Sequence, residues 1–336
     1  VEGGGAAVEA MESAASVYGL SSPPTDGISA VKFAPSTNVL LASSWDAKLR
    51  LYDAAQNRLL HALDTQAVGL DACFIDNSHG VTGGLDGSVR TYDLNQGSVS
   101  TVVGTHAKGV KCVSHCAAHE LLFSGGWDAC VHAWDTRSGV SKTASLQLPG
   151  KVFSLGLSSN RLLVGTSERR LVSYDLRNLK EPEFDRESSL KYQTRCVRVF
   201  PDGTGFAVAS IEGRVAIEYF DPEKEASRYA FKCHRVENTI FPVNCIAFHP
   251  GYGTFATGGG DGLVNIWDGM HKRRLCLLQP FPTSIAALDF NHDGSLLAVA
   301  SSYTFEEGEK DHPADEIYIR AIADSDVKPK PKPQKA

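Results

Sequence analysis

One two-residue pattern recurs along the chain and limits the fold more than any other feature. Pairs of an aromatic residue and aspartate end short strand-like runs at six places: Tyr52-Asp53, Tyr92-Asp93, Trp134-Asp135, Tyr174-Asp175, Phe220-Asp221 and Trp267-Asp268. The spacings between successive aspartates are 40, 42, 40, 46 and 47 residues. A near-constant period of this length indicates a repeat architecture in which each unit packs against its neighbours.

A second acidic residue precedes each of these aspartates by seven residues, or by nine in one longer unit. These acids are Asp46, Asp86, Asp128, Glu168, Glu212 and Asp261. Most lie among small residues, as in 83-GGLDG-87 and 258-GGGDG-262, where a carboxylate can accept N–H groups of a tight turn. We therefore expect all six to anchor turns. Paired catalytic carboxylates are the alternative, but six copies spread around a ring cannot face one substrate.

Each unit also opens with an alternating apolar and polar strand, as in 29-SAVKFAP-35 and 284-SIAALDF-290. The order strand, turn, strand, turn, strand and a weaker fourth strand resembles the Trp-Asp repeat family of β-propellers over about residues 25–322. The expected blade starts lie near residues 27, 68, 109, 151, 194, 243 and 284. The resemblance implies an all-β fold with seven blades.

The last unit departs from this pattern. It carries an acidic insert, 304-TFEEGEKDHPAD-315, and has no fourth strand after 316-EIYIRAI-322. Because an open ring would expose a sheet edge, we expect residues 16–20 to supply the missing strand. The predicted organisation is a propeller over residues 16–322, between a disordered N-terminal tail (1–15) and a disordered Lys/Pro tail (323–336).

Composition excludes several classes of protein. The chain has 33 Lys and Arg against 39 Asp and Glu, so its surface as a whole is not suited to nucleic acid. No apolar run is long enough to span a membrane. The eight cysteines mostly lie in strand-like runs without zinc-site spacing, which indicates reduced thiols of an intracellular protein and no metal site. No catalytic motif is present, so we expect neither an enzyme nor a cofactor.

A local basic cluster is the most informative exception to the acidic composition. Its members are Arg195, Arg214, Lys232 and Arg235, all expected at one end of blade five, called the top. Arg169 and Arg170, in the corresponding turn of blade four, would extend it. Such a cluster suits an acidic or phosphorylated peptide, and the alternative is a solvated basic face whose arginine stems cover apolar surface.

Two tryptophans belong to the same predicted face. Trp45 and Trp127 occupy the turn position in blades one and three. Exposed tryptophan beside arginine is typical of a peptide-binding site, although either ring can instead pack between blades. His106 and His234 precede the anchors Asp128 and Asp261; in the Trp-Asp repeat family, a histidine there bonds the turn acid and stiffens the blade.

Four segments show a closer resemblance. They are 187-ESSLKYQTRCVRVFP-201, 211-IEGRVAIEYFDP-222, 230-AFKCHR-235 and 255-FATGGGDGLVNIWD-268. They are similar to the spindle-assembly-checkpoint propellers of the "budding uninhibited by benzimidazole" group, and the likeness extends over about residues 24–320. The resemblance implies a non-enzymatic adaptor. Its top face would bind the GLEBS segment of a checkpoint kinase or pseudokinase, and would read phosphothreonine in Met-Glu-Leu-Thr repeats of a kinetochore scaffold.

The resemblance also implies roles for individual residues. Arg195 and Arg235 would pair with GLEBS glutamates, next to Trp45 and Trp127. Arg214 and Lys232 would bind the phosphothreonine.

The implied partners extend to the inhibitory assembly of the anaphase-promoting complex. The implied locations are the nucleus, mitotic kinetochores and cytoplasm, for a monomer that contacts neither nucleic acid nor membrane directly. The alternative is the sister propeller, a nuclear-pore messenger-RNA export factor, which shares segments such as IEGRV and FKCHR. The segment SSLKYQTRC and the short N-terminal extension favour the checkpoint group.

Overall fold

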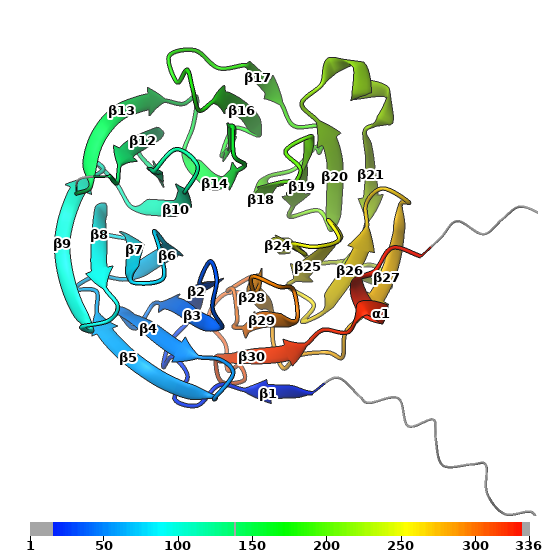
Figure 1. The fold of residues 1–336 in the computed structure, drawn as a ribbon. Coiled ribbons are helices and arrows are strands. Elements are labelled where there is room, and N and C mark those ends of the chain that lie inside the picture. Colours follow the sequence, from blue (N-terminus) through cyan, green and yellow to red (C-terminus); the bar gives the residue numbers. More distant parts are fainter. Residues whose placement is uncertain (1–15, 138, 331–336) are drawn as a thin grey trace, which may run out of the picture.

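The computed structural model describes residues 16–137 and 139–330, and these residues form a ring of seven four-stranded antiparallel sheets (Figure 1). The predicted all-β fold with seven blades is therefore confirmed. The first strand of each blade begins within one residue of the position expected from the repeat. The two helices in the described part of the chain, η1 (Pro222–Ser227) and α1 (Asp324–Val327), are far too short to cross a membrane.

The blades follow one another along the chain. Blades one and two are β2 (Ile28–Phe33), β3 (Val39–Ser44), β4 (Lys48–Asp53) and β5 (Arg58–Asp64), then β6 (Gly69–Phe74), β7 (His79–Gly84), β8 (Ser88–Asp93) and β9 (Ser98–Thr105). Blades three and four are β10 (Val110–Cys116), β11 (Leu121–Gly126), β12 (Cys130–Asp135) and β13 (Ser141–Gln147), then β14 (Val152–Leu157), β15 (Arg161–Thr166), β16 (Arg170–Asp175) and β17 (Phe184–Glu187).

The remaining blades complete the ring. Blade five is β18 (Thr194–Val199), β19 (Gly205–Ser210), β20 (Arg214–Tyr219) and β21 (Tyr229–Lys232), and blade six is β24 (Val243–Phe248), β25 (Phe255–Gly259), β26 (Val264–Asp268) and β27 (Arg273–Leu277). Blade seven is β28 (Ile285–Phe290), β29 (Leu296–Ser301), β30 (Glu316–Ala321) and β1 (Val17–Gly19). A small extra hairpin, β22 (Arg235–Val236) and β23 (Thr239–Ile240), stands between blades five and six.

The N-terminal strand closes the ring, as predicted. β1 pairs antiparallel with β30, with Tyr18 opposite Ile319, so the two ends of the propeller lie side by side in one sheet (Figure 1). The Tyr18 hydroxyl also donates to the carbonyl of Ala54 in blade one at 2.5 Å. Because β1 covers the outer edge of β30, blade seven has four strands, as the other blades do.

Apolar side chains between neighbouring blades hold the ring together. Between blades seven and one, Leu40 and Tyr52 pack with Ile317 and Ile319, and all four are fully buried. Complete burial of an aliphatic side chain of this size stabilises a fold by about 1.5–3 kcal/mol. Similar clusters join the other blades, so each sheet depends on its neighbours for its core.

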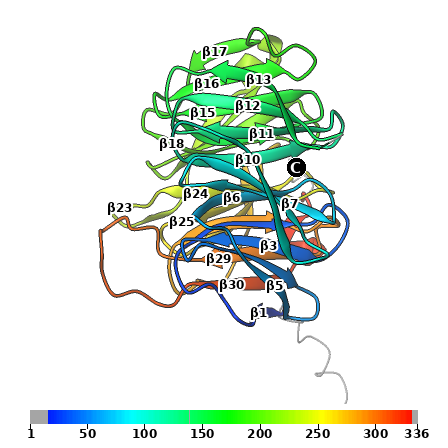
Figure 2. The same cartoon turned by 90° about the vertical axis from the view of Figure 1, so that its left-hand side faces the viewer.

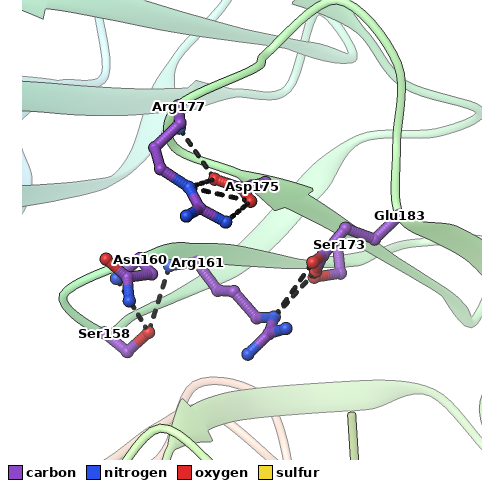
Figure 3. Close-up of polar contacts among 7 residues, drawn as sticks. All are labelled: Ser158, Asn160, Arg161, Ser173, Asp175, Arg177 and Glu183. Atoms are coloured by element: carbon purple, nitrogen blue, oxygen red, sulfur yellow. Dashed lines mark hydrogen bonds and ion pairs between the residues drawn. The ribbon is translucent and has the colours of Figure 1, made fainter. Parts of the chain in front are cut away.

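The recurring aromatic-Asp pairs have a double structural role. Each of the six aspartates accepts an N–H bond from the turn that follows the third strand; they are Asp53, Asp93, Asp135, Asp175, Asp221 and Asp268. In blade four, Asp175 accepts from the backbone and the guanidinium of Arg177 (Figure 3). The aromatic ring before the aspartate packs between blades; Tyr52 and Trp134 are at most 2% exposed. One dipeptide therefore fixes a blade contact and a turn.

The predicted tail over residues 323–336 is wrong in its first part. Residues 324–327 form α1, and Val327 is 1% exposed within the apolar cluster of Ile266 and Leu278. The carbonyl of Val327 accepts a bond of 2.8 Å from the hydroxyl of Thr254. The buried valine and this hydrogen bond join the segment to blade six. The predicted N-terminal tail, 1–15, and residues 331–336 lie outside the described residues.

Candidate peptide-binding face

The top face is the end of the ring that carries the turns between the second and third strands of the blades. Trp45, Trp127 and Arg195 line one hollow at the mouth of the central channel on this face. They come from blades one, three and five, and Trp45 is 47% exposed. We call these three residues the channel-mouth group. The topology brings together residues that lie up to 150 positions apart in the sequence.

Arg195 has a neutral hydrogen-bond partner. Its Nε and Nη2 donate to Asn244 Oδ1 at 3.2 and 2.9 Å, and Asn244 in turn donates to the carbonyl of Ile285. Burial lowers the pKa of Arg195, with the nearby carboxylate of Glu306 acting in the opposite direction. No carboxylate in the described part of the chain forms an ion pair with Arg195. The side chain is thus held in place while its charge stays available for an acidic ligand.

Arg214 and Lys232 are direct cross-strand neighbours in blade five. Arg214 on β20 pairs with Lys232 on β21, so both side chains project from the same face of the sheet. Arg214 has one acidic neighbour, Glu212, whose Oε2 lies 3.5 Å from its Nε. Lys232 has no ion pair among residues 16–137 and 139–330. Two cations therefore stand side by side, and a carboxylate lies close to one of them, Arg214.

Arg235 supports this pair instead of joining Arg195. Its Nη2 donates to the carbonyl of Glu212 at 2.7 Å and its Nε to that of Gly213 at 3.4 Å. It is thus bound to the turn that carries Arg214, and it does not line the hollow of Arg195. We call Arg214, Lys232 and Arg235 the blade-five group. The structure divides the predicted site into two groups.

The predicted extension of the basic patch is neutralised within blade four. Arg169 forms an ion pair with Glu187, and Arg170 forms one with Asp185 at 2.9 Å. Arg169 also donates to the carbonyl of Lys191. Both guanidinium groups have close carboxylate partners, so less of their charge is available to a ligand, and their part in the basic patch stays a prediction.

Four of the six predicted turn anchors accept backbone N–H groups through their carboxylates. Asp46 accepts from Thr25 and Lys48, Asp86 from Ser88, Asp128 from Ala107 and Cys130, and Asp261 from Leu263. The prediction is wrong for the two glutamates, whose carboxylates accept no backbone N–H within the described ranges. Glu168 accepts from the Ser167 hydroxyl, and Glu212 faces Arg214. The longer glutamate side chain carries its carboxylate past the turn.

Histidine and tryptophan complete the anchor in blades three and six. His106 bonds Asp128 through Nδ1 at 3.0 Å and the Ser124 hydroxyl through Nε2, and Trp134 Nε1 donates to the same hydroxyl. In blade six, His234, Asp261, Thr257 and Trp267 form the same chain of bonds. Ser124 and Thr257 were not among the predicted residues. Both lie four residues before the anchor acid in the two Trp-Asp units that have the histidine. This shared position in the sequence could have identified them.

Blades one and two anchor the same turn with arginine. Arg50 pairs with Asp46 and Arg90 with Asp86, in both cases at 2.7 Å and four residues after the acid. The pKa of Asp46 and Asp86 falls below the usual value because these guanidinium groups and nearby hydroxyls donate to the carboxylates. The charges of Arg50 and Arg90 are therefore neutralised by ion pairs within their own blades.

One cluster has the residue types of a metal site, namely His106, Asp128 and His132. Both ring nitrogens of His106 are already bonded, to Asp128 and to Ser124. Burial lowers the pKa of His106 and lowers that of His132 to about 4, and the two rings stack with their centres 4.0 Å apart. The cluster serves the packing of blade three.

Comparison with known proteins agrees with this architecture. A family model described as "WD domain, G-beta repeat" matches residues 15–53, 97–135 and 226–268. A solved structure titled "Structure of U3-55K" superposes with a TM-score of 0.79 over 91% of this chain and 98% of that chain. The sequence identity is only 13%, so this likeness concerns the fold alone.

Several relatives are similar over almost the whole chain. "Mitotic checkpoint protein BUB3.1" of Arabidopsis thaliana is 50% identical over 323 residues, covering 93% of this chain and 95% of the relative. "Mitotic checkpoint protein bub3" of Dictyostelium discoideum is 46% identical, covering 93% of this chain and 96% of the relative. "Protein RAE1" of Arabidopsis thaliana is 35% identical, covering 94% and 93%. The chain therefore belongs to the BUB3 family of mitotic checkpoint propellers.

Proposed function

We propose that this chain is a non-enzymatic checkpoint adaptor that binds peptides on its top face. The channel-mouth group holds a GLEBS segment of a checkpoint kinase or pseudokinase. The blade-five group holds a threonine-phosphorylated Met-Glu-Leu-Thr repeat of a kinetochore scaffold. The observation that carries the proposal is the hollow in which two tryptophans stand near Arg195, an arginine that forms no ion pair with the residues that the structure describes.

The channel-mouth group has the chemistry to bind an acidic peptide. A carboxylate can accept from the guanidinium of Arg195, which Asn244 already orients. Trp45 and Trp127 offer aromatic surface to the apolar residues of the same peptide. Because Asn244 fixes the arginine before binding, little side-chain entropy is lost when the complex forms.

The blade-five group suits a phosphate. A phosphothreonine carries a charge of about −1.5 to −2 and three acceptor oxygens, so Arg214 and Lys232 can both donate to it. Glu212 is the local competitor for Arg214, at 3.5 Å. A phosphate dianion attracts Arg214 more strongly than this single carboxylate does, whereas an unmodified threonine does not.

These two sites would let one molecule join a kinase to a phosphorylated scaffold. The adaptor would bring checkpoint proteins to kinetochores in mitosis, enter the inhibitory assembly of the anaphase-promoting complex, and be nuclear and cytoplasmic at other times. The export-factor reading draws on relatives of lower identity, 35% for RAE1 and 34% for "mRNA export factor GLE2" of Chaetomium thermophilum. Both readings use a GLEBS segment, so the partner decides between them.

Affinity capture from mitotic cells tests the proposal. The bait is the full chain, compared with Arg195→Glu and with Arg228→Glu, an exposed arginine beyond η1 on the opposite end of blade five. We expect a GLEBS-containing checkpoint kinase or pseudokinase with the wild type and with Arg228→Glu, and loss of that partner with Arg195→Glu. Capture of a nucleoporin in place of the kinase would overturn the checkpoint assignment.

A further inference from the structure

The top face has a second hollow, separate from the one at the mouth of the channel. It lies between the β22–β23 hairpin and the loop of residues 303–313, which includes most of the acidic insert. Figure 2 shows the hairpin and this loop extending from the same side of the ring. We call this hollow the hairpin groove. Its apolar lining includes Ile240, Phe241, Pro242 and Phe281.

The loop that forms one wall is built around a buried aromatic side chain. Tyr303 is 6% exposed, and its hydroxyl donates to the carbonyl of Gly308 at 2.9 Å and accepts from the N–H of Glu307 at 3.0 Å. Lys310 Nζ lies 5.0 Å from the centre of the same ring. The first part of the acidic insert is therefore folded around Tyr303.

The hairpin forms the other wall and exposes apolar side chains. Val236 and Ile240 are 52% and 47% exposed at its end. Covering exposed apolar surface of this kind with a ligand removes it from water, which lowers the free energy of the complex. An occupant with aliphatic or aromatic side chains would gain from this contact.

The groove is acidic. The carboxylates along it belong to Glu237, Asp261, Glu306, Glu307 and Asp311. The lysine of the lining, Lys310, already pairs with Glu307 at 2.5 Å, and His312 is the further titratable side chain there. The blade-five group, which is basic, includes Arg235, and Arg235 is also the first residue of this hairpin. Opposite charges therefore stand next to each other on the top face.

One carboxylate oxygen at the groove accepts no hydrogen bond from the residues that the structure describes. This atom, Asp261 Oδ2, is buried, and the side chain as a whole is 2% exposed. The equivalent oxygen in blade three, Asp128 Oδ2, accepts from the N–H of Ala107 at 2.9 Å. In blade six the chain after His234 turns into the hairpin, and Arg235 pairs with Ile240 instead. The site is thus short of one N–H donor.

We propose that the hairpin groove binds a basic and partly apolar segment of a partner peptide. The placement of this segment next to an acidic part held by Arg195 rests on the proposed function. Lysine or arginine of that segment would pair with Glu237, Glu307 and Asp311. Its apolar side chains would cover Val236 and Ile240. The top face would then select peptides in which an acidic stretch adjoins a basic one, since a wholly acidic peptide would meet like charges in the groove.

Three short fluorescein-labelled peptides test the groove without any GLEBS segment. One alternates Lys and Val, one Lys and Ser, and one Glu and Val. Fluorescence anisotropy follows their binding to the full chain, to Glu237→Lys/Asp311→Lys, and to Glu223→Lys/Glu225→Lys. The last variant makes the same change of charge at exposed acids of η1, away from the groove.

We expect the Lys-Val peptide to bind the wild type at least about tenfold more tightly than the other two peptides, because it alone satisfies both the charge and the apolar surface. Glu237→Lys/Asp311→Lys should lose this preference, and Glu223→Lys/Glu225→Lys should keep it. Equal binding of the three peptides, or an equal loss in both variants, would overturn the proposal. The Lys-Val peptide carries no acid for Arg195, so its result does not depend on whether GLEBS binding occurs.

Discussion

Arg214 and Lys232 lie directly opposite each other on β20 and β21, and Arg235 holds the turn from which β20 starts. The proposed phosphate site therefore consists of residues of one blade and the start of the hairpin that follows it. Binding there can therefore be tested by changing single side chains.

Arg214→Ala should remove the preference for a phosphorylated peptide. Charge-assisted hydrogen bonds are worth about 1.5–3 kcal/mol each, so we expect a loss of about tenfold or more in affinity for the phosphorylated form and little change for the unmodified form. Fluorescence anisotropy with paired Met-Glu-Leu-Thr peptides, in the presence of the GLEBS partner, measures both. Binding of the phosphorylated peptide should also weaken steeply with salt. Full wild-type preference in Arg214→Ala would remove this site.

Arg195→Glu should weaken the binding of a GLEBS peptide by several kcal/mol. The substitution removes one ion pair and places a carboxylate against the peptide's glutamates. Isothermal titration measures the effect, with Arg228→Glu as a matched charge reversal on the opposite end of blade five. Because Arg235 lies in the blade-five group, Arg235→Glu alone should weaken GLEBS binding much less than Arg195→Glu does; wild-type affinity in Arg195→Glu would contradict the assignment.

Asp128→Ala should destabilise the propeller by about 1–3 kcal/mol. The carboxylate accepts from His106 and from two turn N–H groups, and these donors would lose their partner. Glu168→Ala is the matched control from blade four, because no turn N–H of the described chain donates to that carboxylate. We expect a change of at most a few tenths of a kcal/mol there. Urea unfolding followed by tryptophan fluorescence compares the two, and equal effects would mean that the turn bonds contribute nothing.

Acid should destabilise the protein through the stacked histidines of blade three. Burial and the neighbouring His106 lower the pKa of His132 from 6.5 to about 4, so the unfolded chain takes up a proton in this range before the folded one does. The contribution of neutral His132 to the free energy of unfolding is then fully present above about pH 6.5 and falls as the pH drops towards 4. A loss of about 1–3 kcal/mol is expected between these values.

The control for this effect is His132→Gln, which cannot take up the proton. Its unfolding free energy should change less between pH 7 and pH 4.5 than that of the wild type, whatever its absolute stability. An unchanged difference between the two pH values would show that other groups cause the acid sensitivity.

The blades could be predicted because their signals are local. The adjacent residues Tyr174 and Asp175 fix a blade contact and a turn, and the same pair recurs every 40 to 47 residues in six of the seven blades. The channel-mouth group could be predicted as well, since the topology of a propeller determines which turns meet at one end.

The division of the basic cluster could not be predicted from spacing. It depends on the choice of hydrogen-bond partner by long side chains: Arg235 takes backbone carbonyls of the neighbouring turn, and Arg170 takes Asp185, which is 15 residues away. The end of the fold was missed for a similar reason. Val327 stands alone among polar residues, and only the surface of blade six makes it part of the core.

The pairing of β1 with β30 has a consequence for how the chain is made. Residues 17–19 leave the ribosome before any blade of the propeller, but their partner at residues 316–321 follows all the other strands of the ring. Six blades can form in order as they emerge, each on the one before, while β1 waits without a partner. Closure is therefore the contact of largest sequence separation and should come last. Until then the nascent ring has two open edges, so a fusion that hinders residues 16–20 would act on assembly itself, far from the face that binds partners.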